Sequence, residues 1–185
     1  MIFAHDTELA LIAYAALVNT EANASHSGID ELAAEEQLAA FLDRHGFSGG
    51  RVGDRAELDD VRALRPQLRR LWSADRDGVV GLINAMLLEG RARPQLVRHD
   101  GWDWHLHATE PSAPLATRMR VEAAMAFVDV IRSDEHERVR FCEADDCDAV
   151  LVDLSRNRSK RYCDVGNCGN RMNVTAYRAR KAARP

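Results

Sequence analysis

The four cysteines of this chain lie close together and are the residues best suited to chemistry. They form two pairs, with four residues between the members of each pair and fifteen between the pairs: Cys142 with Cys147, and Cys163 with Cys168. Zinc prefers four ligands in a tetrahedron, and sulfur is among those it binds best. The spacing therefore predicts a Zn²⁺ site. Because sulfur fills all four positions, the site is expected to be structural and not catalytic.

Two other interpretations of the cysteines are weaker. Four incidental buried thiols would not be expected to gather within 27 residues, with none elsewhere in the chain. Disulfides would require export, and the N-terminal segment lacks the basic stretch of a secretion signal. The apolar run at 9–18 is also too short to span a bilayer. We therefore expect a cytoplasmic protein that is not associated with a membrane.

The sequence around the cysteines predicts a small fold built on the metal. A β-prone run at 149–154 follows the first pair, and we expect the chain between the pairs to form a hairpin that returns near Tyr162. After Cys168 the sequence has helical periodicity, so this cysteine is expected to begin a helix. Gly169 would then let the backbone approach the metal. The arrangement is typical of a treble-clef-like zinc finger, here assigned to residues 138–185.

The charges of the chain are divided unevenly. Residues 156–185 carry nine Lys and Arg against one acid, whereas the rest of the chain is strongly acidic, and the net charge is -4. This polarity predicts that the finger contacts DNA through phosphates. The candidate contacts are Arg156, Arg158, Lys160, Arg161, Asn170, Arg171, Arg178 and Lys181.

Other roles for these residues stay open. The basic finger could dock on the acidic part of its own chain, bind RNA, or serve as an adaptor for an acidic protein. Asn170 and Arg171 could instead support the metal, with Arg171 offsetting the negative charge of four thiolates around one zinc ion. Sequence-specific binding by a single finger would be expected to need a homodimer.

Residues 1–137 read as a mainly α-helical domain with one small β-hairpin. Apolar residues recur at helical spacing in five segments, at 6–20, 31–46, 54–72, 77–90 and 114–133. Pro66 lies inside the third segment and predicts a kink or a break there. Alternating apolar and polar residues at 95–108, around Asp100-Gly101, predict the hairpin.

The hairpin also carries the residues of a candidate ligand pocket, His99, His105 and His107. His105 and His107 share one strand face, where they could hold a metal ion or a small-molecule effector. The more ordinary interpretation is an aromatic-rich hairpin packed on helices. No phosphate-binding loop, nucleophile elbow or HExxH motif occurs, so no enzymatic activity is expected.

Short sequences at both ends of the chain carry a resemblance to known families. "CGNR" at 168–171, with the paired cysteines before it and "AYRARKA" after it, resembles the CGNR zinc-finger family. "ALVNT" at 16–20 and the helix "LAAFLDRHG" resemble the ABATE domain, which commonly precedes this finger in bacterial proteins. The resemblance implies a zinc-binding transcription regulator, linked to stress, whose helical domain serves in sensing or assembly.

Overall fold

The computed structural model describes residues 2–98 and 103–183, and these residues are mostly helical. The six α-helices found there are α1 (His5–Val18), α2 (Glu35–Arg44), α3 (Arg55–Ser73), α4 (Arg76–Glu89), α5 (Leu115–Arg132) and α6 (Cys168–Ala182). Two antiparallel hairpins join β1 (Gln95–Val97) to β2 (His105–His107) and β3 (Val139–Phe141) to β4 (Val150–Val152). The 3-10 helix η1 (His136–Arg138) precedes β3. The expected fold class, mainly helical with a small hairpin and a C-terminal four-cysteine cluster, is confirmed.

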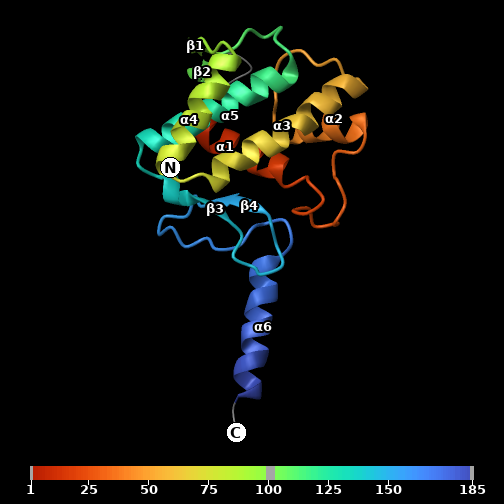
Figure 1. Ribbon diagram of the computed structural model, residues 1–185, viewed down its shortest axis with the longest axis vertical. Coiled ribbons are helices and arrows are strands. Elements are labelled where there is room, and N and C mark those ends of the chain that lie inside the picture. The colour runs from red at the N-terminus through yellow and green to blue at the C-terminus, as the bar shows by residue number, and fades with distance from the viewer. Residues whose placement is uncertain (1, 99–102, 184–185) are drawn as a thin grey trace.

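The helical body is organised around α5, which packs against α1, α3 and α4 (Figure 1). Alanines let the neighbouring helices approach, since Ala123 and Ala124 are fully buried beside Phe127. Trp72 of α3 meets the Phe127 ring edge-on, with 5.0 Å between the ring centroids. The apolar stripe expected for α3 is buried along its whole length, from Leu58 to Trp72. None of the helices in the described ranges is long and apolar enough to cross a membrane.

The break expected at Pro66 does not occur, because α3 runs through it. Proline cannot donate the hydrogen bond that the carbonyl of Arg62 would receive in a regular helix. The side chain of Arg65 supplies a donor instead, with its Nε 3.4 Å from that carbonyl oxygen. Burial of Leu64 and Leu68 on either side of the proline holds the helix on the core. The predicted break is therefore wrong, whereas the alternative of a kink stays a prediction.

The second hairpin differs from the expected one. β4 lies between the cysteine pairs, as its β-prone sequence indicated, but it pairs with β3, which precedes Cys142. The expected return strand near Tyr162 is not a strand. The cause is the apolar core of the body, because Val139, Val150 and Val152 are all buried in it. Burial of β3 and β4 side by side thus decides the pairing.

Buried hydrogen bonds join this hairpin to the helical body. The amide side chain of Asn19, at the end of α1, donates to the carbonyl of Val150 and accepts from its N–H, both at 2.8 Å. The indole Nε1 of Trp72 donates to the carbonyl of Leu151 at 3.1 Å. The boundary at residue 137 remains a prediction, and the first strands beyond it share the core of the body.

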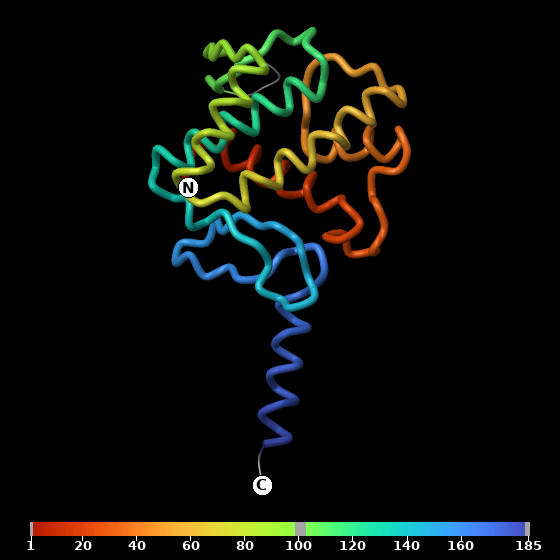
Figure 2. The backbone as a smooth tube through the Cα atoms, in the orientation of Figure 1, coloured from red at the N-terminus to blue at the C-terminus, as the bar shows by residue number. Residues whose placement is uncertain are grey.

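Helix α6 extends away from the rest of the molecule (Figure 2). Cys168 is buried and Met172 is partly buried, but every residue from Asn173 to Ala183 is exposed. An isolated helix of this length is only marginally stable in water. Its first turn must therefore be held firmly by the cysteine region.

An ion pair fastens the loop before α2 to the body. The Arg65 guanidinium donates to both carboxylate oxygens of Asp30, at 2.8 and 2.7 Å, and also to the Thr20 hydroxyl. Hydrogen bonding from Arg65, partly opposed by burial, lowers the pKa of Asp30 from 3.8 to about 2. The ionised form of Asp30 therefore stabilises the folded state relative to the unfolded state.

We predict that Asp30→Asn lowers the free energy of unfolding at pH 7 by about 2 kcal/mol, the value of the pKa shift. Because the pKa is depressed by folding, this stabilisation is fully present above pH 3.8 and is lost as the pH falls through about 2. Urea titrations of both proteins at several pH values would measure the difference. Asp59→Asn, which removes only exposed ion pairs of α3, serves as the control and should cost less than about 1 kcal/mol. An equal loss in the two variants would contradict the assignment.

Candidate metal centre and nucleic-acid interface

The four cysteine sulfurs converge on one point. All four Sγ atoms lie within 4.8 Å of one another. The Sγ atoms are 3.7 Å apart in Cys147 and Cys163 and 3.6 Å apart in Cys163 and Cys168. A tetrahedral zinc ion with sulfurs at 2.3 Å requires sulfur–sulfur distances of about 3.8 Å. The geometry of the cluster therefore fits a zinc ion, and no disulfide forms among these cysteines.

Turns and one helix start bring the sulfurs together. Cys142 follows β3 directly and its N–H donates to the carbonyl of Ala149, while the N–H of Cys147 closes a turn on Ala144. Cys168 is the first residue of α6, as expected, and Asn167 before it has a positive φ of 51°. The glycine whose backbone lies close to the sulfur cluster is Gly166, where an added Cβ would lie 3.3 Å from the sulfur of Cys168. Gly169, the expected one, faces the Tyr162 ring instead.

Burial and hydrogen bonding shift the pKa values of three of the four cysteines. Burial raises the pKa of both Cys147 and Cys163 above the ordinary value of a thiol. Burial also acts on Cys168, but hydrogen bonds from Arg171 and from the other cysteines lower its pKa. Metal binding requires thiolates. A divalent ion at the centre would supply the positive charge that burial of these thiolates demands.

Arg171 lies beside the sulfur cluster. Its guanidinium donates to the sulfur of Cys168 at 3.2 Å and to both carboxylate oxygens of Asp146, at 2.5 and 3.0 Å. Asp146 belongs to the loop between Cys142 and Cys147, so this contact also joins the two cysteine pairs. In this position Arg171 can offset the negative charge of the thiolates, which is one of the two roles predicted for it from the sequence.

Three further basic residues of the finger are held by acids. Lys160 pairs with Asp164 at 2.6 Å and Arg161 with Glu143 at 2.5 Å. Arg158 contacts Glu135 at 2.9 Å and Glu137 at 3.2 Å, both close to η1. Spacing alone could not predict two of these pairs, because Glu143 lies 18 positions from Arg161 and Glu135 lies 23 positions from Arg158. Asp164, in contrast, lies only four positions from Lys160. A nucleic acid would have to compete with each of these carboxylates.

The other predicted contacts are exposed and make no ion pair with a described residue. They are Arg156 in the loop after β4, Asn170 in the first turn of α6, and Arg178 and Lys181 further along α6. Arg178 and Lys181 are three residues apart and so share a helix face. Arg180 adds a further exposed charge to the same helix. The part of α6 beyond the sulfur cluster is thus a solvated, positively charged helix.

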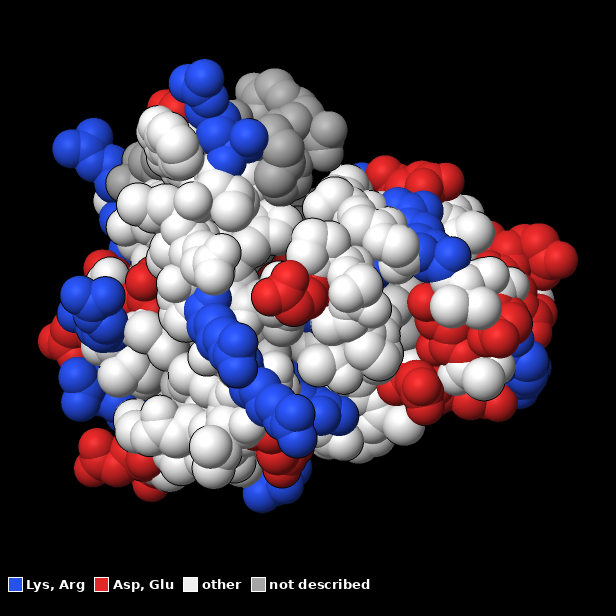
Figure 3. All heavy atoms as spheres, turned by 90° about the horizontal axis from the view of Figure 1, so that it is seen from above, with Lys and Arg blue, Asp and Glu red and all other residues white. Residues whose placement is uncertain are grey.

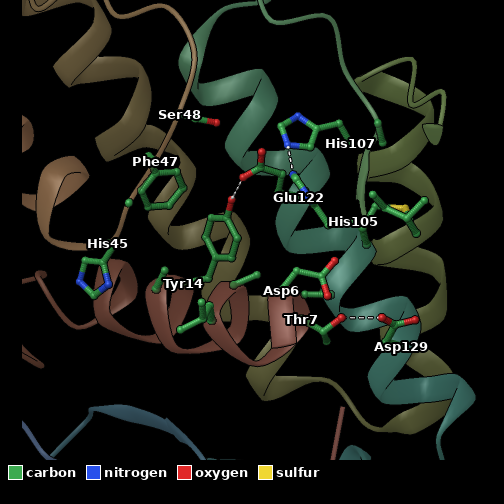
Figure 4. Close-up of a pocket in the computed structure, with 18 residues that line it drawn as sticks. Asp6, Thr7, Tyr14, His45, Phe47, Ser48, His105, His107, Glu122 and Asp129 are labelled. Carbon is green, nitrogen blue, oxygen red and sulfur yellow. Dashed lines mark hydrogen bonds between the residues drawn. The ribbon is translucent and has the colours of Figure 1, made fainter. Parts of the chain in front are cut away.

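A cavity in the helical body contains two of the predicted pocket residues. His105 and His107 of β2 line it, with their Nε2 atoms 3.1 Å apart (Figure 4). His99 lies outside the described residues. The sequence analysis missed Tyr14 and Glu122, which also line the cavity and are joined by a hydrogen bond of 3.0 Å. Burial raises the pKa of Glu122, although Tyr14, Arg118 and His105 oppose the change. The sequence signal that could have indicated Glu122 is its position as an acid next to the buried alanines of α5.

The fold and the cluster together define a zinc-finger protein with a helical N-terminal part. Residues 13–134 match the ABATE family, described as "Putative stress-induced transcription regulator", and residues 138–181 match the CGNR zinc finger. The chain therefore belongs to the ABATE family and carries a C-terminal CGNR zinc finger. No curated protein matches it. The resemblance found in the sequence is confirmed.

We predict that Arg171→Ala weakens metal retention about tenfold or more, the usual cost of losing a residue that supports a metal ligand. The loss follows because Cys168 and Asp146 would both lose a positive partner. Competition with a chromophoric zinc chelator would measure the affinity. Arg178→Ala removes the same side chain two turns further along α6 and should leave retention unchanged. Equal weakening by both variants would show that Arg171 has no particular role at the cluster.

Proposed function

We propose that this protein is a DNA-binding transcription regulator whose zinc ion fixes the direction of helix α6. The observation that carries the proposal is that α6 is basic, is exposed from Asn173 to Ala183 and, among the described residues, is held through its start at the four-cysteine cluster. A helix presented in this way fits the major groove of duplex DNA, which admits an α-helix. The family description, a stress-induced transcription regulator, supports the same function.

Zinc bound by Cys142, Cys147, Cys163 and Cys168 is the structural cofactor in this proposal. It would join the turn after β3 to the start of α6, while Arg171 and Asp146 support it from one side. The ion has no open position for a substrate, and a family of transcription regulators acts by binding. We therefore propose no enzymatic activity. We also propose a cytoplasmic location, where cysteine thiols stay reduced.

The residues proposed to contact phosphates are those that pair with no carboxylate of the described residues, above all Arg178 and Lys181 of α6 and Arg156 of the finger loop. Arg158, Lys160 and Arg161 are proposed as secondary contacts, because their ion pairs would first have to break. Asn170 lies next to Arg171 on α6 and is proposed to reach a phosphate or a base edge. The helical body is proposed to serve in sensing or assembly, including formation of a homodimer on DNA.

We predict one zinc ion per chain after purification under reducing conditions. Removal of zinc by a chelator should release α6 and the loop before it, because a short helix without tertiary support is marginal. Strands β3 and β4 should stay folded, since they belong to the core of the body. Metal analysis and amide hydrogen exchange would test both expectations, with Cys163→Ser as a second way to lose the ion. A metal content near zero with α6 still protected would contradict the role of zinc.

We predict that the protein is retained on duplex DNA at low salt and that the double variant Arg178→Glu, Lys181→Glu is not. Each lost phosphate contact should reduce the slope of log affinity against log salt by about 0.9. Gel-shift titrations across salt, with duplex DNA and single-stranded RNA side by side, would measure this. The matched control is Arg44→Glu, Arg70→Glu, which makes the same change of charge at exposed sites on the body. Equal retention of both double variants would refute α6 as the contact, and retention on RNA alone would favour the RNA-binding alternative.

A further inference from the structure

A cavity of about 230 Å³ lies between α1, α5, β2 and the turn after α2. It is larger than the engineered cavities of about 150 Å³ that bind benzene. Figure 4 shows that side chains from α1, α5 and β2 point into the same space. The cavity shares no residue with the cysteine cluster.

Much of the cavity wall is apolar. The apolar and aromatic side chains come from four parts of the body and include Ala10, Ala13, Phe47, Leu106, Met125 and Ala126. Pockets for small organic molecules are typically lined in this way, with a few polar groups that fix the orientation of the ligand. The body of a ligand should therefore be apolar and compact.

The ionisable side chains of the cavity are carboxylates, the phenol of Tyr14 and the imidazoles of His45, His105 and His107. Three carboxylates line it, those of Asp6, Glu122 and Asp129, and no Lys or Arg is among the described lining residues. Asp129 accepts a hydrogen bond of 2.6 Å from the Thr7 hydroxyl through one oxygen. Glu122 accepts from Tyr14 through Oε2, and its Oε1 accepts from no described residue. Among the described residues, each of these two acids thus has one oxygen that accepts no hydrogen bond and could accept one from a ligand.

The arginine nearest to Glu122 does not satisfy it. Arg118 attracts this carboxylate but donates its N–H groups to backbone carbonyls, from Nε to Ala113 at 3.1 Å and from the two terminal nitrogens to Ser48 and Gly50. His105 also attracts Glu122, but no Lys or Arg of the described residues donates a hydrogen bond to Glu122 or Asp129. A ligand that brings donors and positive charge would restore the balance.

We infer that this cavity binds a small organic cation, with an ammonium group near Glu122 and an apolar body against Phe47 and Met125. The inference deepens the sensing role proposed above by naming the class of effector. Helix α1 gives the site a connection to the finger, because it contributes Tyr14 to the cavity and Asn19 follows it at the β4 contact.

The test compares three probes of similar shape on the full-length protein, by isothermal titration calorimetry. They are 2-phenylethylamine as the cation, 2-phenylethanol as the neutral analogue and 3-phenylpropionate as the anion. The amine should bind at least about tenfold more tightly than the alcohol, and the acid should give no detectable binding. Absence of heat with the amine up to about 5 mM, or equal binding of the three probes, would overturn the inference.

Two variants locate the binding. Glu122→Gln keeps the shape of the side chain and should lose at least about tenfold in affinity for the amine, because the charge is removed. Asp6→Asn should also lower the affinity for the amine, and it provides a second test should the first variant fold poorly. Glu36→Gln, at an exposed site on α2, is the control and should bind the amine normally. Amine binding that survives both cavity variants would overturn the inference. No DNA enters these titrations, so their failure leaves the DNA-binding proposal standing, and failure of the gel shifts would not affect them.

Discussion

The convergence of four sulfurs is the constraint on which the finger depends. Helix α6 touches the rest of the described molecule only near its start, where Cys168 meets the other cysteines, Arg171 reaches Asp146 and Gly169 lies by Tyr162. Nothing else described sets the direction of its remaining turns. The other half of the finger has a different support, since β3 and β4 are part of the apolar core. The sulfur cluster and the apolar core thus hold the two halves of one small unit.

The sequence predicted the parts of the fold that depend on local pattern. Helical periodicity located the helices, and the cysteine spacing located a cluster that the folded chain does assemble. The two errors come from contacts that the hydrophobic pattern does not encode, one local and one between distant segments. The course of α3 through Pro66 depends on Arg65, and the pairing of β4 depends on burial of Val150 in the body. Periodicity carries no information about either contact.

In the candidate sites, too, the sequence predicted what depends on local pattern and not what depends on contacts in the folded chain. The basic tail was evident from composition, but its ion pairs were not, so the sequence could not separate Arg158 from Arg178. In the body, alternation placed His105 and His107 on one strand face, and both do line the cavity. Glu122 comes from a helix that starts eight residues after that strand ends. Only the packing of α5 beside β2 reveals that these side chains meet.

The length of α6 bears on how opposite charges are kept apart. Acidic side chains gather over the side of the body where α2 lies, and this face is turned away from α6 (Figure 3). A helix of 15 residues is about 22 Å long, more than twice the screening distance of about 8 Å at physiological salt. A polyanion gripped near the tip of α6 would therefore feel little repulsion from the carboxylates of the body. The projecting helix thus acts as a spacer between the acidic body and the basic residues near the end of α6.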